Sequence, residues 1–454
     1  MTATIDCILS LCTFFSLFTP QFPADEDNSD SQFVDSLGRH YSDYSVVAYY
    51  NFPAANQRCG VWYINPKLVC YALLTARINV QKENYRPDIY AYFKSTDGHT
   101  NAWSFSLRRP NLHLIEHILE CKGLIIVDST RRGKRFPDAL SKTIPIWCAV
   151  VSSAVLGIPA EDLLYTPPNA ISESEKQAIK DGLPTWREWL VNSALQLNKK
   201  LDKPLRPIFI HPETQFLPDF STSTLDFYPI LCVSASRYIP DQIERRSWGE
   251  YVQGSGDDHE LWAKGLTPEA FWENQDELLS CSSEMLNECI VEIMSERQTH
   301  STKDVGSANR TFLKGAIYPS SSEAGVPEDD AFVALTPNPP SRSKNTMHIT
   351  LPKSSKQAQK EFLAKLPSIV DFIERELNKG GHVAICDANG GTDLASVVCV
   401  AIATLFFDEN GEKISRNTNI TKTAINMRLQ WLINVYPSSN PSRVSLKRLN
   451  DYLM

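Results

Sequence analysis

Short runs of apolar, mostly β-branched residues recur along the first half of the chain and predict buried strands. The clearest, Gly123 to Val127, ends at Asp128 and breaks directly into a polar, basic loop. Further strands are expected at Ile208 to Ile210 and around Tyr228 to Val233, with an amphipathic helical stretch at Glu173 to Gln196. Strands that alternate with helices predict an α/β domain.

The last part of the chain shows the same alternation. Apolar positions recur at helical spacing over Gln357 to Leu377, and Gly380-Gly381 ends that helix. A strand at His382 to Cys386, the loop Asp387 to Asp393 and an apolar helix at Leu394 to Phe407 follow. A glycine loop between a strand and a helix N-terminus forms a potential anion cradle.

A polar, Ser/Pro-rich tract separates these two regions. It carries one expected strand at Phe312 to Ile317 and ends in the linker-like run TPNPPSRSKN. The fold class is therefore α/β with two domains. We predict a divergent or disordered leader at 1–31, an N-terminal α/β domain at 32–297, a connecting region at 298–345 and a C-terminal α/β domain at 346–454.

The composition supports a globular protein of this size. A chain of 454 residues, 42% of them hydrophobic, is long enough for two domains that each bury a core. The net charge of −8 argues against indiscriminate binding to nucleic acid, although a local basic patch suffices to hold a few phosphates. The eleven cysteines are scattered without CxxC pairs, which predicts reduced thiols and a cytoplasmic protein.

The apolar run Ile8 to Phe18 is too short to span a bilayer. A secretory signal would need a cationic start and a small-residue cleavage site, but no Lys or Arg precedes this run, so a true signal or anchor is the alternative and not the expectation. We interpret the leader as a divergent segment or an incorrectly assigned first exon.

The most informative stretch is DSTRRGKRFPDALSKTIPIWCAVV, from Asp128 to Val151. Ligands bind at the carboxyl ends of strands in open α/β sheets, and guanidinium groups there can hold phosphate oxygens bidentately. The alternative is a solvated surface charge run. We predict that this segment handles phosphate through Asp128, Ser129, Thr130, Arg131, Arg132, Lys134, Arg135 and Lys142.

A second segment is acidic. Asp257, Asp258 and Glu260 follow a flexible Gly-Ser-Gly run. Carboxylates at a loop can hold Mg²⁺ together with water and substrate phosphates. The alternative is an acidic N-cap of the helix that begins near Glu260.

A third segment, YFKSTDGHTNAWSFSLRRPNLHL, interleaves basic and aromatic residues from Tyr92 to Leu114. This mixture suits phosphate binding and base stacking, although a hairpin with packing aromatics is the alternative. Asp97 or His99 is a candidate general base for a hydroxyl nucleophile. The expected substrate-binding residues are Lys94, Ser95, Thr96, Arg108 and Arg109.

The fourth segment is the loop after Cys386. A cysteine-phosphatase loop pairs its cysteine with an arginine six positions on, and here that position is Thr392. No guanidinium in the loop can stabilise a thiolate or bind an oxyanion, so phosphatase chemistry is disfavoured. Phosphate binding by the loop remains open, through Cys386, Gly390, Gly391, Thr392 and Asp393.

Taken together, these segments resemble the initiator-tRNA 2′-O-ribosyl phosphate transferase family of fungi and plants. The resemblance runs from Gln32 to the end of the chain, including PSRVSLKRLNDYLM from Pro441 to Met454. The sequence departs from the family in its first thirty or so residues and in the loop CDANGGTDLAS, which lacks the family's lysine. The other matching runs are KSTDGHT, SLRRPNLHL, VDSTRRGKRFPDALSKTIPIWCAV and QGSGDDHELW.

The resemblance implies an N-terminal catalytic-type domain and a C-terminal domain similar to dual-specificity phosphatases. Family members transfer ribose 5-phosphate from phosphoribosyl pyrophosphate to the 2′-hydroxyl of a T-stem purine nucleotide of initiator tRNA, which excludes that tRNA from elongation. We expect cations and Mg²⁺ to neutralise the departing pyrophosphate. Neither a membrane nor a stable protein partner is implied.

The sequence leaves two points open. Arg131, Arg132, Lys134 and Arg135 can hold the donor, or they can hold tRNA while the donor binds in the C-terminal cradle. The rival functions are a phosphatase-like phosphoester hydrolase and a non-catalytic tRNA-binding protein.

Overall fold

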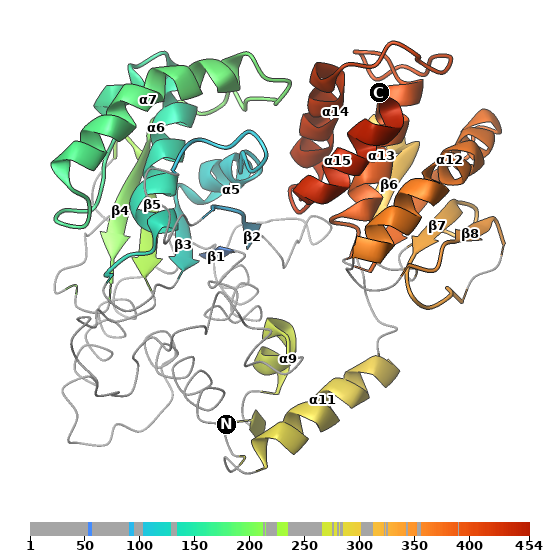
Figure 1. The fold of residues 1–454 in the computed structure, drawn as a ribbon. Coiled ribbons are helices and arrows are strands. Elements are labelled where there is room, and N and C mark those ends of the chain that lie inside the picture. Colours follow the sequence, from blue (N-terminus) through green and yellow to red (C-terminus); the bar gives the residue numbers. More distant parts are fainter. Residues whose placement is uncertain are drawn as a thin grey trace. The chain divides into compact units, whose positions relative to one another are not determined.

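The computed structural model divides the chain into two compact units (Figure 1). One comprises Met1–Asn192 and Leu197–Thr299, and the other comprises Ser193–Gln196 and His300–Met454. The structure describes residues 53–56, 90–94, 103–128, 134–211, 214, 225–234, 266–274, 277–278, 281, 285–300, 312–321, 323, 326–341, 344–351, 356–388 and 390–454.

The first unit contains a five-stranded parallel sheet in the order β2-β1-β3-β5-β4. All seven residues of β5 are buried, as expected for a parallel strand covered on both faces. The strands are β1 (Pro53–Asn56), β2 (Tyr90–Ala91), β3 (Leu124–Asp128), β4 (Leu205–Ile210) and β5 (Tyr228–Ser234).

The strand order places a topological switch point between β1 and β3. Within the sheet, β2 lies next to β1 on one side and β3 lies next to β1 on the other side. The strand order therefore changes direction after β2. In open α/β sheets, ligands bind outside the carboxyl ends of the strands at such a point. The basic segment predicted to handle phosphate follows β3 directly in the sequence, and its first residue, Asp128, ends that strand at this edge of the sheet.

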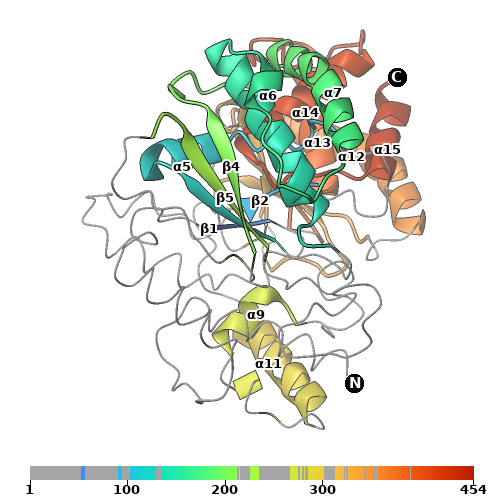
Figure 2. The same cartoon turned by 90° about the vertical axis from the view of Figure 1, so that its left-hand side faces the viewer.

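Some helices of the first unit pack beside the sheet, and others lie apart from it (Figures 1 and 2). α6 lies against β4 and α7 packs on α6, whereas α5 contacts β3. The helices are α5 (Leu114–Cys121), α6 (Ile144–Leu156), α7 (Glu173–Val191), α9 (Pro268–Glu273) and α11 (Leu286–His300), with a 3₁₀ turn at Ala160–Leu163.

A π-helical turn, Ala139–Thr143, leads into α6. The Ile144 N–H donates to the carbonyl oxygen of Ala139, five residues back. Pro145, which has no N–H to donate, follows in the first turn of α6, where a proline is tolerated. Such π turns are rare and occur frequently at functional sites.

The second unit contains a four-stranded parallel sheet in the order β6-β9-β7-β8. Its strands are β6 (Ile317–Ser320), β7 (Ala331–Leu335), β8 (Thr346–His348) and β9 (Val383–Asp387). Its helices are α12 (Lys356–Asn378), α13 (Leu394–Phe406), α14 (Lys422–Val435) and α15 (Arg443–Leu453), and a 3₁₀ turn spans Phe312–Gly315.

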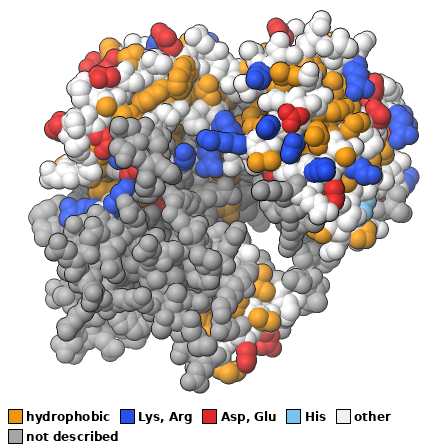
Figure 3. Space-filling view, viewed as in Figure 1, with side chains coloured by type: hydrophobic (Ala, Val, Ile, Leu, Met, Phe, Trp, Pro, Cys, Tyr) orange, Lys and Arg blue, Asp and Glu red, His pale blue; other side chains and the backbone are white. Residues whose placement is uncertain are grey.

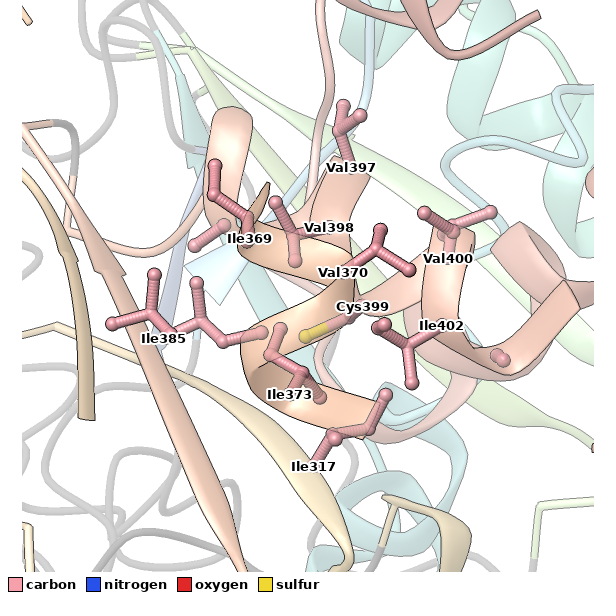
Figure 4. Packing of buried hydrophobic residues seen from close by; sticks show 14 of the residues in the cluster. Ile317, Ile369, Val370, Ile373, Ile385, Val397, Val398, Cys399, Val400 and Ile402 are labelled. Atoms are coloured by element: carbon pink, nitrogen blue, oxygen red, sulfur yellow. The ribbon is translucent and has the colours of Figure 1, made fainter. Parts of the chain in front are cut away.

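The core of the second unit forms around α13, every residue of which is buried. Figure 4 shows Ile369, Val370 and Ile373 of α12 together with Ile385 of β9 and Val398 of α13 in this core. A helix that is apolar on all sides must be enclosed on all sides, which explains why α12, α14, α15 and the sheet surround it.

Most expected elements are present, and the strands at β3, β4, β5 and β9 are confirmed. The expected strand at Phe312 to Ile317 is wrong, because Gly315 at φ 83° closes a 3₁₀ turn and the strand begins only at Ile317. A strand in the polar tract was missed. β7, with the sequence AFVAL, lies there and pairs with β9.

Within the part of the chain that the structure describes, one helical stretch, Ala139–Leu156, is long and apolar enough to cross a membrane. It is 78% buried within the protein. The buried core helix of a globular domain has the same length and composition, and α6 occupies that position in the first unit.

Candidate functional site

The candidate site lies at the carboxyl edge of the first sheet. Asp128 ends β3 and is 1% exposed, and it pairs in register with Ser234, which ends β5 and is also 1% exposed. Paired residues of neighbouring strands lie on the same face of a sheet. Two buried polar side chains therefore stand together at the edge where the switch point predicts a ligand.

Only part of the predicted basic segment is described. Asp128, Lys134, Arg135 and Lys142 are described, and Arg135 is exposed. The remaining predicted residues of this segment, Ser129, Thr130, Arg131 and Arg132, lie outside the described residues.

A chain of alternating charges holds the described lysines. The Asp138 carboxylate, whose side chain is 6% exposed, lies 2.8 Å from the Lys134 ammonium and 3.3 Å from that of Lys142. Lys142 also contacts Glu175 of α7 over 2.7 Å, and the Trp103 indole N–H donates to the same Glu175 oxygen over 2.8 Å. These partly buried ion pairs fix the position of both lysines relative to the sheet.

The environment of Lys142 favours its charged form. Burial acts to lower the pKa of Lys142, but the hydrogen bond to Glu175 and the charges of Asp138 and Glu175 outweigh it. The pKa of Lys142 therefore lies above its ordinary value, and its ammonium is engaged by two carboxylates.

The third predicted segment meets the first one here. The Thr143 hydroxyl donates to the carbonyl oxygen of Lys94 over 2.8 Å, and the Trp147 indole N–H donates to that of Pro110 over 2.7 Å. Asn111, with φ 50°, accepts from the Tyr92 N–H over 2.7 Å. The two segments that sequence patterns selected independently thus form one structural unit.

The predicted residues of the third segment are only partly described. Lys94 is exposed, and Arg108 and Arg109 are half-buried. Ser95, Thr96, Asp97 and His99 lie outside the described residues.

His113 supports this segment as a neutral side chain. Its Nε2 lies 2.9 Å from the carbonyl oxygen of Tyr90, the first residue of β2. The pKa of His113 is lowered to about 4, mainly by burial, with the Tyr90 contact opposing the shift and the neighbouring His117 adding to it. His113 is therefore uncharged at neutral pH and has a positioning role.

The predicted metal ligands Asp257, Asp258 and Glu260 lie outside the described residues. Among the residues that are described, no group of three or more His, Cys, Asp or Glu side chains could hold a metal ion.

The C-terminal loop already contains an anion. The Asp387 carboxylate, 4% exposed, accepts hydrogen bonds from the backbone N–H groups of Gly391, Asp393 and Ala395 over 2.8, 3.1 and 2.9 Å. These are donors of the kind that would hold a phosphate at a helix N-terminus. In this loop, a carboxylate of the chain itself takes the place of a ligand.

The same loop is tied to the C-terminal segment. The Ser442 N–H donates to the Asp393 carboxylate over 2.9 Å, and the Asn440 N–H donates to the carbonyl oxygen of Thr392 over 2.8 Å. Gly391 has φ 83°, and an added Cβ there would lie 2.7 Å from the carbonyl oxygen of Ser320. Only glycine fits at that position.

Cys386 is not poised for nucleophilic catalysis. Burial raises the pKa of the Cys386 thiol to about 12, and the charges of Asp387 and Glu323 add to the effect. A phosphatase nucleophile requires the opposite shift, toward the thiolate. The thiols of Cys148, Cys232, Cys281, Cys289, Cys386 and Cys399 are free.

Sequence patterns missed four polar groups that matter here. Asp138 and Glu175 lie 37 residues apart in the chain, as their numbers show, and only the fold brings both to Lys142. Ser234 had no signal beyond its place at the end of a predicted strand. Asp387 had a sequence signal, because it directly precedes the glycine loop, but the same position is also typical of an exposed loop residue.

Comparison with known proteins covers both units. The model of the Rit1 N-terminal domain matches residues 27–295, and that of the Rit1 DUSP-like domain matches residues 345–453. A Saccharomyces cerevisiae protein named tRNA A64-2′-O-ribosylphosphate transferase is 31% identical over 461 residues, which cover 88% of this chain and 86% of that protein. An uncharacterised protein of Schizosaccharomyces pombe is 32% identical over 453 residues, 94% of this chain and 92% of that protein.

Among solved structures, the crystal structure of human DUSP28 matches 33% of this chain and 97% of its own chain, with 15% identity and a TM-score of 0.24.

Proposed function

Because the chain belongs to the Rit1 family, we propose that it is a pentosyltransferase that adds a ribosyl phosphate group to a 2′-hydroxyl of tRNA. The observation that carries this proposal is the 31% identity to a named tRNA ribosylphosphate transferase over 88% of the chain. The match extends through both units, so the proposal concerns the whole chain and not one domain.

The donor in this proposal is phosphoribosyl pyrophosphate. It carries a 5-phosphate and a pyrophosphate on one sugar, and both require cations. The carboxyl edge of the first sheet supports this assignment, because Lys134 and Arg135 follow β3 beside the switch point. Arg131 and Arg132 belong to the same segment and share the proposed role.

The acceptor in this proposal is the 2′-hydroxyl of a T-stem purine nucleotide of initiator tRNA. A group added there would mark the tRNA for initiation and exclude it from elongation. Lys94, Arg108 and Arg109, which the fold joins to the basic segment, are proposed to contact the tRNA backbone. Duplex RNA is recognised mainly by shape and 2′-hydroxyls, which suits a T stem.

The donor is proposed to bind at the N-terminal sheet edge and not in the C-terminal loop. In that loop, the amides of Gly391, Asp393 and Ala395 already donate to Asp387. A phosphate at the same amides would have to displace the carboxylate or lie against its charge, and two neighbouring anions repel each other. The loop residues predicted to bind substrate are better explained as an internal structural anchor.

The proposed reaction needs a group that accepts a proton and cations that stabilise the leaving group. The 2′-hydroxyl oxygen of the tRNA forms a bond to C1 of the donor ribose, the bond from C1 to pyrophosphate breaks, and pyrophosphate leaves with the electron pair. Asp97 or His99 is the proposed acceptor of the hydroxyl proton. Arg131, Arg132 and Lys134 are proposed to stabilise the charge that develops on the leaving group.

Lys142 is proposed to act through position and not by direct contact. Its two carboxylate partners, Asp138 and Glu175, already satisfy its ammonium. It holds Asp138 in place, and Asp138 in turn holds Lys134.

Mg²⁺ remains part of the proposal, held by Asp257, Asp258 and Glu260. When bound, it would neutralise pyrophosphate, since Mg²⁺ prefers oxygen ligands and substrate phosphates. A cytoplasmic location is also proposed, and the free thiols of the described cysteines fit a reducing compartment.

The rate at which label moves from phosphoribosyl pyrophosphate to tRNA tests this proposal. Lys134→Ala and Arg132→Ala should each lower that rate by at least tenfold, because charge-assisted contacts to phosphate are lost. Lys176→Ala is the matched control, since Lys176 on α7 has only a 3.9 Å contact with an exposed Glu173. If both site variants transfer label at the wild-type rate, the assignment of this segment is wrong.

The same assay addresses the two rival functions. A phosphoester hydrolase would release phosphate without labelling tRNA, and a tRNA-binding protein without activity would bind tRNA and use no donor. The raised pKa of the Cys386 thiol opposes the hydrolase, and no observation favours the binding protein over the transferase.

A further inference from the structure

A buried hydroxyl without a partner marks the carboxyl edge of the first sheet. The Oγ of Ser234 has no hydrogen-bond partner among the described residues, and Ser234 is 1% exposed. An exposed hydroxyl would be satisfied by water, but this one is withdrawn from solvent. A buried polar group left unpaired costs on the order of 1–3 kcal/mol, so its presence requires an explanation.

The position of Ser234 suggests that a ligand supplies the partner. Ser234 is the last residue of β5, next to β3 and one strand away from the switch point. By contrast, Ser153 is also buried and unpartnered but lies within helix α6 and does not end a strand. Both serines have a buried hydroxyl without a hydrogen-bond partner, but only Ser234 lies where a ligand is expected.

Asp128, the neighbour of Ser234, restricts which chemical groups the ligand can place at this site. Asp128 pairs with Ser234 in register and lies on the same face of the sheet. A carboxylate repels phosphate unless a metal intervenes, but it accepts hydrogen bonds readily from hydroxyl groups. A serine hydroxyl both donates and accepts, which also suits a hydroxyl partner.

The donor of the proposed reaction carries two hydroxyl groups of this kind. The 2- and 3-hydroxyls of its ribose are adjacent, and they lie between the 5-phosphate and the pyrophosphate. The cations that follow β3 suit the phosphates, whereas Asp128 and Ser234 at the strand ends suit the sugar. A carboxylate that binds a ribose hydroxyl at the end of a neighbouring strand is an established solution in dinucleotide-binding folds.

We propose that Ser234 and Asp128 together bind the vicinal hydroxyls of the donor ribose and select a ribosyl over a deoxyribosyl donor. This inference rests on the proposed function, because it concerns the donor of that reaction. Ser234 is a specificity-determining residue in this account, and none of the sequence patterns pointed to it.

Ser234→Ala tests the inference with three donors: phosphoribosyl pyrophosphate and its 2-deoxy and 3-deoxy analogues. Loss of one neutral hydrogen bond should lower kcat/KM with the ribosyl donor by roughly three- to tenfold. With the analogue that lacks the hydroxyl bound by Ser234, wild type and variant should transfer at the same rate. Each comparison keeps the donor fixed, so the intrinsic reactivity of the analogues cancels.

Two controls separate this role from a structural one. Ser153→Ala removes the same atom from another buried, unpartnered serine and should leave all three kcat/KM values unchanged. Ser234→Ala should melt at the wild-type temperature or above it, because an unpartnered hydroxyl contributes no hydrogen bond to the fold.

The outcomes are distinct. A loss confined to donors that carry the hydroxyl supports the inference. An equal loss with all three donors, as a metal-binding role for the site would give, overturns it, and so does the absence of any loss. If the wild type transfers nothing from any of the donors, the proposed function itself fails and this inference fails with it.

Discussion

The backbone N–H of Gly391 lies 2.8 Å from the carboxylate of Asp387, four residues before it in the chain. Two further amides of the loop, from Asp393 and Ala395, donate to the other oxygen of the same carboxylate. The loop therefore has the outline of a phosphatase cradle, but the group that its amides stabilise belongs to the protein. Under the proposal that the donor binds in the N-terminal unit, this carboxylate would let a DUSP-like domain keep the shape of the loop without a bound phosphate.

Asp387→Asn should destabilise the C-terminal unit. The amide can accept with one atom only, so at least one buried backbone N–H loses its partner and the charge-assisted bonds are weakened. We expect the free energy of unfolding to fall by about 2–4 kcal/mol, measured by denaturant titration. Asp371→Asn is the control, since Asp371 is exposed and contacts Arg416 at 3.8 Å only. An Asp387→Asn variant as stable as this control would contradict the anchor role.

Cys386 should be unreactive at neutral pH. Because burial first, and the charges of Asp387 and Glu323 second, raise the pKa of this thiol to about 12, it stays protonated and resists alkylation at pH 8. Mass spectrometry after iodoacetamide treatment should find the half-buried Cys281 modified before Cys386. Cys386→Ser should leave tRNA transfer at the wild-type rate. Rapid labelling of Cys386, or hydrolysis of a generic phosphoester that depends on it, would revive the phosphatase alternative.

Glu175→Gln should weaken the support of the basic segment. The variant keeps a hydrogen-bond acceptor for Trp103 but removes the charge that holds Lys142, so we expect a loss of about 1–2 kcal/mol in unfolding free energy and slower transfer. Glu173→Gln is the matched control on the same helix, because Glu173 is 89% exposed.

This loss should depend on pH in one direction. The folded-state pKa of Lys142 is raised above its ordinary 10.5, so the stabilisation is complete below that value and disappears as pH rises through the folded-state pKa. The stability difference between wild type and Glu175→Gln should be constant from neutral pH to about pH 10 and should shrink above it. A difference that stays the same at higher pH would show that the charge of Lys142 is not involved.

His113 should make the N-terminal unit sensitive to mild acid. Burial, with a smaller effect of His117, lowers its folded-state pKa from 6.5 to about 4, so between these values the unfolded chain binds a proton that the folded chain does not. Stability is therefore lost as pH falls from 6.5 toward 4, by up to about 3 kcal/mol. His113→Gln should lose less stability over this range and should match the wild-type pH dependence above pH 7. Parallel curves for both proteins throughout would contradict the assignment.

The sequence predicted those features that depend on local patterns. β3, β5 and β9 are continuous apolar runs, and α12 has regular helical spacing, so their identity follows from the chain alone. β7 is equally apolar, but it lies within a Ser/Pro-rich tract, and its role as a core strand depends on pairing with β9, which is remote in sequence. Composition describes such a tract as a linker, whereas tertiary pairing makes part of it a strand.

Part of the candidate site could also be predicted from the sequence, and part could not. The basic segment was predictable because it combines a strand end with several cations within eight residues. The partners of those cations were not, because Glu175 reaches Lys142 only through the packing of α7 on α6. Ser234 depends on the order of the strands, which no local pattern specifies.

The surface of the C-terminal unit adds a further feature that the sequence did not single out. Figure 3 shows Lys and Arg side chains spread among hydrophobic ones on one face of this unit. Exposed cations of α12 and α15 include Lys360, Arg443 and Lys447. If these two helices help to hold tRNA, the double variant Lys360→Ala, Lys447→Ala should bind tRNA more weakly, with a smaller salt dependence, and should bind the donor normally. Unchanged tRNA binding across a salt titration would exclude a role for these two lysines.

The proposed function is tested most sharply by incubating the purified chain with Mg²⁺, mixed tRNAs and phosphoribosyl pyrophosphate labelled in its 5-phosphate, and by mapping the labelled nucleotide. We expect label at one T-stem purine of initiator tRNA. The label should sit on the 2′-oxygen, so that the adjacent phosphodiester resists alkali. Free labelled phosphate with no labelled tRNA, or equal labelling of initiator and elongator tRNAs, would contradict it.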